Sequence, residues 1–499
     1  MSPDSKLLRG SAWNLAGQVV PLLVAIVSIP WLIRWVGLER FGFIALAWVL
    51  IGYASLFDLG IGRALIRTVS AKLALGDAAG AAASGRTGLS FLLLFGLLAG
   101  ALTALLTSAL VSHVLVVPPA LQGEAHDAMW LLALSLPFVM ITNGYVGVLS
   151  AHQAFKLLNL IRASFSVLSY LLPLALAAAG WVSLPAVVGT ILCLRIVGTL
   201  AFALACRRRF GFGWSVDRPD RALTLELLSL GGWMSVSNLV SPLLSYLDRL
   251  LIGTLVPLRG VGIYAAPYDL LSRMMAIPYA VVAAFFPIAT ALQAGSPMAA
   301  KALCDISRYL FLLMFPLLFA TMVLAHPAMT LWLGPEIGPQ AATVLQILVL
   351  GVFFNALAQG PATLIQAAGR PRDMAILHLV ELPLFLLLLW QLTARWGITG
   401  TAVAASLRFS LDAVAVLVLA LRGLVARPWP WRGAVLPALM AALLFAAALP
   451  CRTWGVAAAV LVPGGALFAL LAWKRLLPPS ERLRIVALLG PRGRRWRSK

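Results

Sequence analysis

The stretch TGLSFLLLFGLLAGALTALLTSALVS, residues 87–112, contains no charged side chain. As an α-helix rising about 1.5 Å per residue, it is longer than the roughly 20 residues that cross the hydrocarbon core of a bilayer. Apolar segments of the same kind follow one another along the chain, separated by short breaks. The pattern predicts an all-α integral membrane protein built from transmembrane helices.

The composition excludes a soluble domain. Of the 499 residues, 62% are hydrophobic and 11% are charged, and the mean hydropathy is +0.97, whereas a soluble chain needs far more charge to cover its surface. The net charge is +21. Because basic residues collect in the cytoplasmic loops of membrane proteins, we expect anionic membrane lipids, and no nucleic acid, as partners of this charge.

The apolar runs predict about fourteen transmembrane helices. Their expected ranges are 11–34, 41–63, 87–112, 128–149, 157–179, 184–206, 226–255, 261–291, 305–333, 341–367, 374–394, 398–421, 433–450 and 454–473. The cysteines form no CxxC and the histidines no paired spacing, so we expect no metal and no other cofactor.

The charges of the breaks give the orientation. Basic residues occupy alternate breaks and both ends of the chain, among them Lys6 and Arg9; Arg63, Arg67, Lys72 and Arg86; Lys156 and Arg162; and Arg207, Arg208 and Arg209. The intervening breaks hold few, namely Arg40, Arg259, Arg395 and Arg452, with Arg34 at a helix end. Since basic loops stay in the cytoplasm, this alternation predicts that both termini are cytoplasmic.

A basic linker divides the chain into two halves of six helices each. The predicted parts are an N-terminal six-helix lobe 1–206, the linker 207–223, a C-terminal six-helix lobe 224–422, helices 13 and 14 at 423–473, and a basic cytoplasmic tail 474–499. A shift of 220 residues aligns Trp13 with Trp233, Val36 with Val256, Leu38 with Leu258, Gly42 with Gly262 and Ala45 with Ala265. This weak repeat predicts two parallel lobes around a central cavity.

Short segments in a particular order resemble one family of membrane proteins. They are Leu8–Asn14, Gly37–Gly42, Asp58–Arg67, Gln153–Lys156, Asp248–Gly253, Val261–Tyr264 and Trp396–Ala402. In this order and spacing they resemble bacterial oligosaccharide flippases of the Wzx type, which belong to the multidrug/oligosaccharidyl-lipid/polysaccharide exporter superfamily. The likeness covers about residues 8 to 422.

The resemblance implies a transporter and not an enzyme. It implies alternating access between two lobes, and an undecaprenyl-pyrophosphate-linked oligosaccharide as substrate, moved from the cytoplasmic to the periplasmic leaflet of a bacterial inner membrane. The product would serve O-antigen, capsule or exopolysaccharide biosynthesis. A polysaccharide polymerase and chain-length machinery are the further partners that it implies.

Charged residues inside the predicted helices are the candidates for this work, because they are costly in lipid and usually face the interior of a bundle. A guanidinium stays charged and binds phosphate oxygens in a fork. The candidate substrate-binding residues are Arg195, Arg408, Arg249, Arg273 and Arg63. The candidate carboxylates, for ion coupling or ion pairing, are Asp248, Asp269, Glu381, Asp412 and Asp58.

A purely structural role is the alternative for each of these charges. Arg408 has Asp412 one turn away, which favours a local ion pair. For Asp269 and Arg273, also one turn apart, and for Asp248 and Arg249, the structural alternative is an interhelical network that holds the predicted helices 226–255 and 261–291 together. Arg195 has no acidic neighbour within its predicted helix. It is therefore the arginine for which the sequence offers no local counter-charge.

Three other functions fit part of the pattern. A cation-coupled multidrug exporter of the same superfamily would favour an acidic cavity, which the intramembrane arginines disfavour. A lipid II flippase of the same superfamily is the other transport alternative. A membrane-bound polymerase or ligase is disfavoured because the longest predicted periplasmic break, 113–127, contains no arginine. The absence of a GxxxxGK[ST] motif excludes ATP hydrolysis by a P-loop in this chain.

Overall fold

The computed structural model describes residues 20–21, 23–54, 61–213, 244, 247–290, 292, 296–424 and 432–483. Regular structure in these ranges is entirely helical. Nine of the described helices are long and apolar enough to cross a membrane, and the shorter helices Leu23–Val36 and Val435–Ala448 are also apolar. The prediction of an all-α membrane protein is confirmed.

The chain divides into two compact units. The first unit contains Met1–Ala266 and His378–Thr401, and the second contains Pro267–Leu377 and Ala402–Lys499. The predicted lobe boundaries stay a prediction, because most of the linker 207–223 lies outside the described residues.

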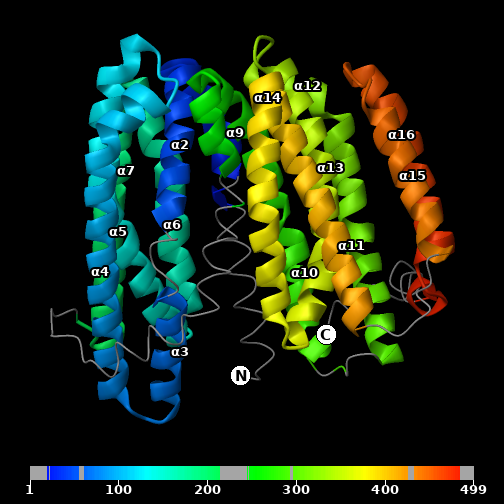
Figure 1. Ribbon diagram of the computed structural model, residues 1–499, viewed down its shortest axis with the longest axis horizontal. Coiled ribbons are helices and arrows are strands. Elements are labelled where there is room, and N and C mark those ends of the chain that lie inside the picture. The colour runs from blue at the N-terminus through cyan, green and yellow to red at the C-terminus, as the bar shows by residue number, and fades with distance from the viewer. Residues whose placement is uncertain are drawn as a thin grey trace, which may run out of the picture. The chain divides into compact units, whose positions relative to one another are not determined.

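In the first unit, long helices pack side by side (Figure 1). They are α2 (Leu38–Ala54), α3 (Ile61–Ala74), α4 (Ala78–Ala109), α5 (Gln122–Ala151), α6 (Phe155–Ala178), α7 (Leu184–Phe210), the beginning of α9 (Leu258–Met274) and the segment His378–Thr401 of α14 (Pro371–Leu424), with the short turns η1 (Leu110–Val114) and η2 (Pro119–Leu121). Helix α5 packs against α4 and α7, and α6 packs against α7.

The start of α4 corrects the predicted range 87–112. The helix begins at Ala78 because the Asp77 side chain caps it, its Oδ1 accepting a hydrogen bond of 2.7 Å from the backbone N–H of Gly80. Arg86 therefore lies inside α4 and not in a break.

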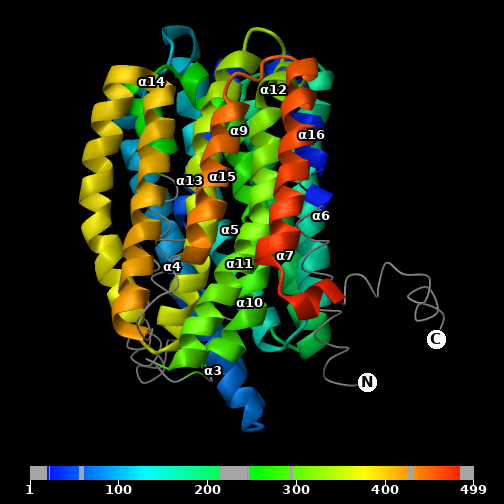
Figure 2. The same ribbon diagram turned by 90° about the vertical axis from the view of Figure 1, so that its right-hand side faces the viewer.

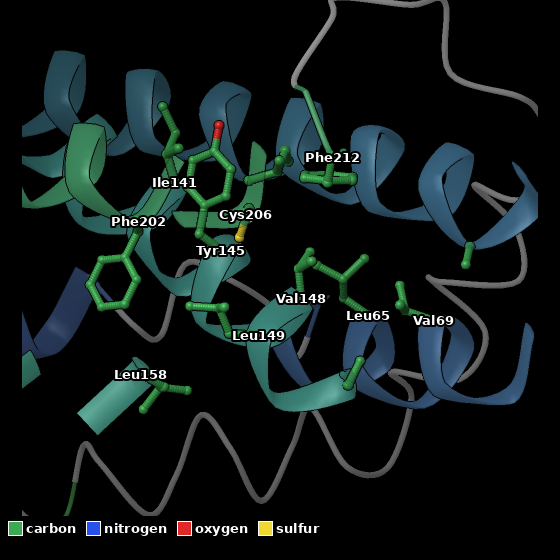
Figure 3. Close-up of a cluster of buried hydrophobic side chains, with 13 residues drawn as sticks. Leu65, Val69, Ile141, Tyr145, Val148, Leu149, Leu158, Phe202, Cys206 and Phe212 are labelled. Atoms are coloured by element: carbon green, nitrogen blue, oxygen red, sulfur yellow. The ribbon is translucent and has the colours of Figure 1, made fainter. Parts of the chain in front are cut away.

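A core of buried side chains joins α3, α5 and α7 (Figure 3). Tyr145 of α5 meets the edge of the Phe212 ring, which follows α7, at 6.4 Å between centroids. Gly85 of α4 makes room for that ring, since a Cβ there would lie 2.6 Å from it. The end of α7 is thus held against the start of α4.

The helices of the second unit are shorter than predicted at two places. Its elements are the rest of α9, α10 (Ala276–Thr290), α11 (Pro297–Val323), α12 (Ala325–Leu333), α13 (Gly338–Ala367), the later part of α14 (Pro371–Leu424), α15 (Arg432–Ala448) and α16 (Trp454–Leu471) with the turn η3 (Ala472–Leu476). The predicted helices 261–291 and 305–333 are each broken, at Met275 and at Leu324. Pro278 and Pro327 explain both breaks, because a proline ring clashes with the carbonyl four residues earlier.

Helix α14 contains the predicted turn between helices 374–394 and 398–421. Gly397 has φ 56° and ψ −138°, a conformation open to glycine, and it separates two helices within α14. The buried hydroxyls of Thr393 and Thr401 lie 2.8 Å apart across this turn. Gly400 allows the close approach, since a Cβ there would overlap the carbonyl oxygen of Leu392.

Helices α15 and α16 pack against α11 (Figure 2). Phenylalanine side chains make this contact. The fully buried ring of Phe315 on α11 lies 5.3 Å from Phe445 of α15 and 5.1 Å from Phe468 of α16. Gly464 of α16 lets Phe319 approach, because a Cβ would lie 2.6 Å from that ring. The last two described transmembrane helices therefore belong to the core of the second unit.

Helices α2 and α9 cross within the first unit at residues that the repeat aligns. A Cβ on Gly42 would lie 1.9 Å from the carbonyl oxygen of Leu258, and one on Gly262 would lie 3.0 Å from the carbonyl oxygen of Leu38. The contact is reciprocal, and glycine at both positions lets the two backbones touch.

An ion pair ties α2 to α5 and α7. The Arg40 guanidinium donates to both carboxylate oxygens of Glu124, from Nε at 2.9 Å and from Nη2 at 2.6 Å. The backbone N–H of Leu184, at the start of α7, donates to the same carboxylate at 2.9 Å. Arg40 is one of the few basic residues in a predicted periplasmic break, and this fork gives it a structural role.

We expect Gly42→Ala to destabilise the protein, because the new methyl group overlaps the Leu258 carbonyl. Overpacking of this kind costs about 1–3 kcal/mol. Thermal unfolding in detergent measures the loss as a lower Tm. Gly123→Ala is the matched control, since a Cβ there meets nothing within 4 Å. Equal Tm values for the two variants would contradict the close crossing of α2 and α9.

We expect Glu124→Gln to lower the free energy of unfolding by about 1 kcal/mol, because the pair is bidentate but partly exposed. A double-mutant cycle with Arg40→Gln should show coupling, with the double variant no less stable than either single variant. Glu39→Gln removes an exposed neighbouring charge and serves as the control. Additive losses would show that the fork contributes nothing.

Candidate functional site

Arg195 lies in the middle of the inward face of α7. Buried or largely buried neighbours precede and follow it at helical spacing, namely Val188, Ile191, Leu192, Thr199 and Phe202. The exposed residues Val197, Leu200 and Leu204 lie on the opposite face. The half-buried Arg195 side chain therefore points into the first unit and not toward lipid.

The hydroxyls of Thr142 on α5 and Thr199 on α7 form hydrogen bonds next to the backbone of Arg195. The Thr199 hydroxyl donates to the Arg195 carbonyl at 2.7 Å and lies 2.9 Å from the Thr142 hydroxyl of α5. The guanidinium itself makes no hydrogen bond or ion pair with any residue that the structure describes. An arginine in this position is suited to an anionic ligand, since its charge has no partner on the protein side in the described ranges.

Asp248 and Arg249 form a second buried group in the first unit. Asp248 is 2% exposed and Arg249 is 5% exposed. The hydroxyl of the fully buried Tyr264 on α9 donates to Oδ2 of Asp248 at 2.6 Å, and the backbone N–H of Arg249 donates to Oδ1 at 2.7 Å. Two donors thus hold the carboxylate between the helical residues 247–255 and α9.

Sequence reasoning missed Tyr264 as a partner of Asp248. The signal was present, because a tyrosine in an otherwise apolar stretch needs a hydrogen-bond partner when it is buried. The short, fully buried hydrogen bond from Tyr264 to Asp248 therefore joins α9 to residues 247–255. A role in ion coupling for Asp248 stays a prediction.

The remaining candidates lie on α9 and α14. Asp269 and Arg273 are half-buried one turn apart on α9. Arg408 and Asp412 are half-buried one turn apart on α14, and the Arg408 guanidinium lies 4.4 Å from the centre of the Phe409 ring. Their substrate and pairing roles stay predictions.

Three further candidates are placed only in part. Glu381 is half-buried on the first helix of α14. Arg63 belongs to α3, but its side chain lies outside the described part of the chain, and so does Asp58 as a whole.

The comparisons with known proteins agree with one another on the family. Residues 31–336 match the family described as "Polysaccharide biosynthesis protein". The chain is 28% identical over 411 residues to the "Putative O-antigen transporter" of Shigella flexneri, covering 82% of this chain and 96% of that protein.

Solved transporter structures share the fold. The lipid II flippase MurJ in an inward closed conformation superposes with a TM-score of 0.74 at 12% identity, covering 94% of this chain and all of that one. An inward-facing multidrug resistance transporter of the MATE family, from the MOP superfamily, gives a TM-score of 0.61 at 13% identity, covering 81% and 97%. These likenesses support the predicted transporter fold, and the match over residues 31–336 shows that the chain belongs to the polysaccharide biosynthesis protein family.

Proposed function

We propose that this protein flips an undecaprenyl-pyrophosphate-linked oligosaccharide across a bacterial inner membrane. The substrate moves from the cytoplasmic to the periplasmic leaflet by alternating access, and both termini of the protein lie in the cytoplasm. The family match and the relative whose name refers to O-antigen transport support this function. A polysaccharide polymerase and chain-length machinery would receive the flipped product.

The position of Arg195, half-buried on the inward face of α7, is the main support for the proposal. A diphosphate bears negative charge, and its transfer into apolar surroundings without compensation costs many kcal/mol. A fixed guanidinium on the inward face of α7 offsets that cost where the head group must pass. The same residue would be a poor binding partner for a cationic drug, since like charges repel.

The carboxylate of Asp248 is proposed as the group through which ion binding acts on transport. It is held by Tyr264 next to the buried Arg249. Its neutralisation by a proton would change the charge balance of this group, and with it the contacts of Arg249. Asp269, Glu381 and Asp412 are the other carboxylates that such coupling could use.

A strain that lacks the protein tests the function. We expect a complete undecaprenyl-linked repeat unit to accumulate, detected by mass spectrometry of extracted lipids and confined to the cytoplasmic leaflet, as an impermeant lectin would report. Accumulation of lipid II would assign the protein to peptidoglycan precursors instead. Normal lipid pools together with raised sensitivity to cationic drugs would replace the flippase with an exporter.

We expect Arg195→Ala to reduce flipping at least about tenfold while the protein remains inserted and folded. The variant loses a charge-assisted hydrogen bond to phosphate, which is worth about 1.5–3 kcal/mol. Export of the polysaccharide in the complemented strain is the measurement. Arg208→Ala, at the exposed end of the same helix, is the control and should export normally. Export at the wild-type rate from a well-expressed Arg195→Ala protein would remove this residue from the site.

A further inference from the structure

The connection between α4 and α5 contains a short segment outside the helices, Leu115–Val117, which we call the strap. It lies in the predicted periplasmic break 113–127, at the end of the first unit where α2 and α9 begin (Figure 1). Its side chains alternate as in a strand, since Leu115 and Val117 are each 7% exposed and Val116 between them is 40% exposed. The strap therefore turns two of its three apolar side chains into the protein.

A hydrogen bond joins the strap to the helical residues 247–255. The backbone N–H of Val116 donates to the carbonyl oxygen of Gly253 at 2.8 Å. In a continuous α-helix that oxygen would accept a hydrogen bond from the residue four positions further on, but this residue is Pro257, which has no N–H. Val116 thus supplies the donor that Pro257 cannot supply.

Glycine at position 253 lets three segments of the chain meet at this hydrogen bond. A Cβ there would lie 2.9 Å from Cδ1 of Leu46 on α2 and 3.3 Å from Cδ2 of Leu115 in the strap. Gly42, which makes the close contact with Leu258, lies one turn before Leu46 on α2. The strap contact and the crossing of α2 with α9 are therefore neighbouring parts of one interface within the first unit.

This interface joins the two halves that the sequence repeat defines. Residues 38–46 and 115–117 belong to the predicted N-terminal lobe, and residues 253–262 belong to the predicted C-terminal lobe. All of them nevertheless lie in the same compact unit, Met1–Ala266 with His378–Thr401. Alternating access requires the two lobes to separate on the periplasmic side when the substrate leaves. The hydrogen bond from Val116 to Gly253 has to break in that step.

We propose that the strap holds the periplasmic side of the protein closed and detaches from residues 247–255 when that side opens. A single backbone hydrogen bond contributes only a factor of about two to ten to such an equilibrium, so the strap detaches reversibly. Pro257 keeps the carbonyl of Gly253 free of a competing intrahelical donor, which preserves the acceptor for reattachment. The inference rests on the proposed function and its orientation, and it adds the residues that keep the outer side closed.

A disulfide between the strap and residues 247–255 tests whether the strap has to detach. In a protein otherwise free of cysteine, Leu115→Cys and Gly253→Cys place two thiols within reach of each other. Export of the polysaccharide in the complemented strain is measured after oxidation and again after reduction. We expect oxidation to stop export and reduction to restore it, because the disulfide prevents separation of the two lobes.

A second disulfide within the predicted N-terminal lobe is the matched control. Leu131→Cys and Gly189→Cys again replace a leucine and a glycine, here on α5 and α7, where a Cβ on Gly189 would lie 4.0 Å from Cδ1 of Leu131. Oxidation of this pair should leave export unchanged. Export that continues through a fully formed disulfide between positions 115 and 253 would overturn the role of the strap and leave the flippase function intact. A strain that exports normally without any copy of the protein would overturn both.

Removal of the donor alone tests the hydrogen bond. Val116→Pro deletes the backbone N–H, and Leu115 before it already has the conformation that a following proline requires, with φ −90° and ψ 138°. The reporter is a cysteine in place of the fully buried Leu258, labelled from the periplasm by an impermeant maleimide. We expect labelling to become between about twofold and tenfold faster. Val116→Ala keeps the N–H and should label at the original rate, whereas equal rates for the two variants would show that this bond does not hold the outer side closed.

Discussion

Burial of a charged guanidinium inside a helical bundle costs free energy, and this cost constrains which groups surround the arginines of this protein. A charged side chain away from water needs a counter-charge, hydrogen bonds or a ligand. Arg40 meets the requirement with the carboxylate of Glu124, which also receives the backbone of α7. Arg195 lies on an inward helix face without such a carboxylate in the described ranges. The contrast separates an arginine that joins helices from one that is available to an anion.

Close contacts between helices provide the rigid surroundings that such an arginine needs. Between helices in lipid the hydrophobic effect contributes little, so packing and small residues determine where two backbones meet. Gly42 and Gly262 allow the reciprocal crossing of α2 and α9, whereas the Phe165 ring of α6 lies at ordinary contact distance beside Gly198 of α7. Ring contacts then fill the spaces that the glycines open, as Phe212 does over Gly85.

Much of the fold could be predicted because hydrophobic length is a strong signal in membrane proteins. The ranges for α5, α6, α7 and α13 agree to within several residues at each end, and the turn at Gly397 falls between two predicted helices. Local chemistry caused the errors: the cap at Asp77 lets α4 begin at Ala78, and Pro278 and Pro327 interrupt runs that are largely apolar on both sides. For the site, the lack of an acidic neighbour singled out Arg195. The pairing of Asp248 with Tyr264 depends on which helices meet, and no spacing within one helix reveals that.

The phenylalanine contacts of α15 and α16 have a consequence for biosynthesis. Phe315 lies on α11, but two of its ring partners, Phe445 and Phe468, are more than a hundred residues further along the chain. A ribosome therefore releases α11 into the membrane with its aromatic surface uncovered, and this surface stays uncovered until α15 and α16 have been made. During that interval the apolar aromatic surface of α11 is exposed to other helices that insert into the membrane. The aromatic core of the second unit is therefore completed only when α15 and α16 have been made.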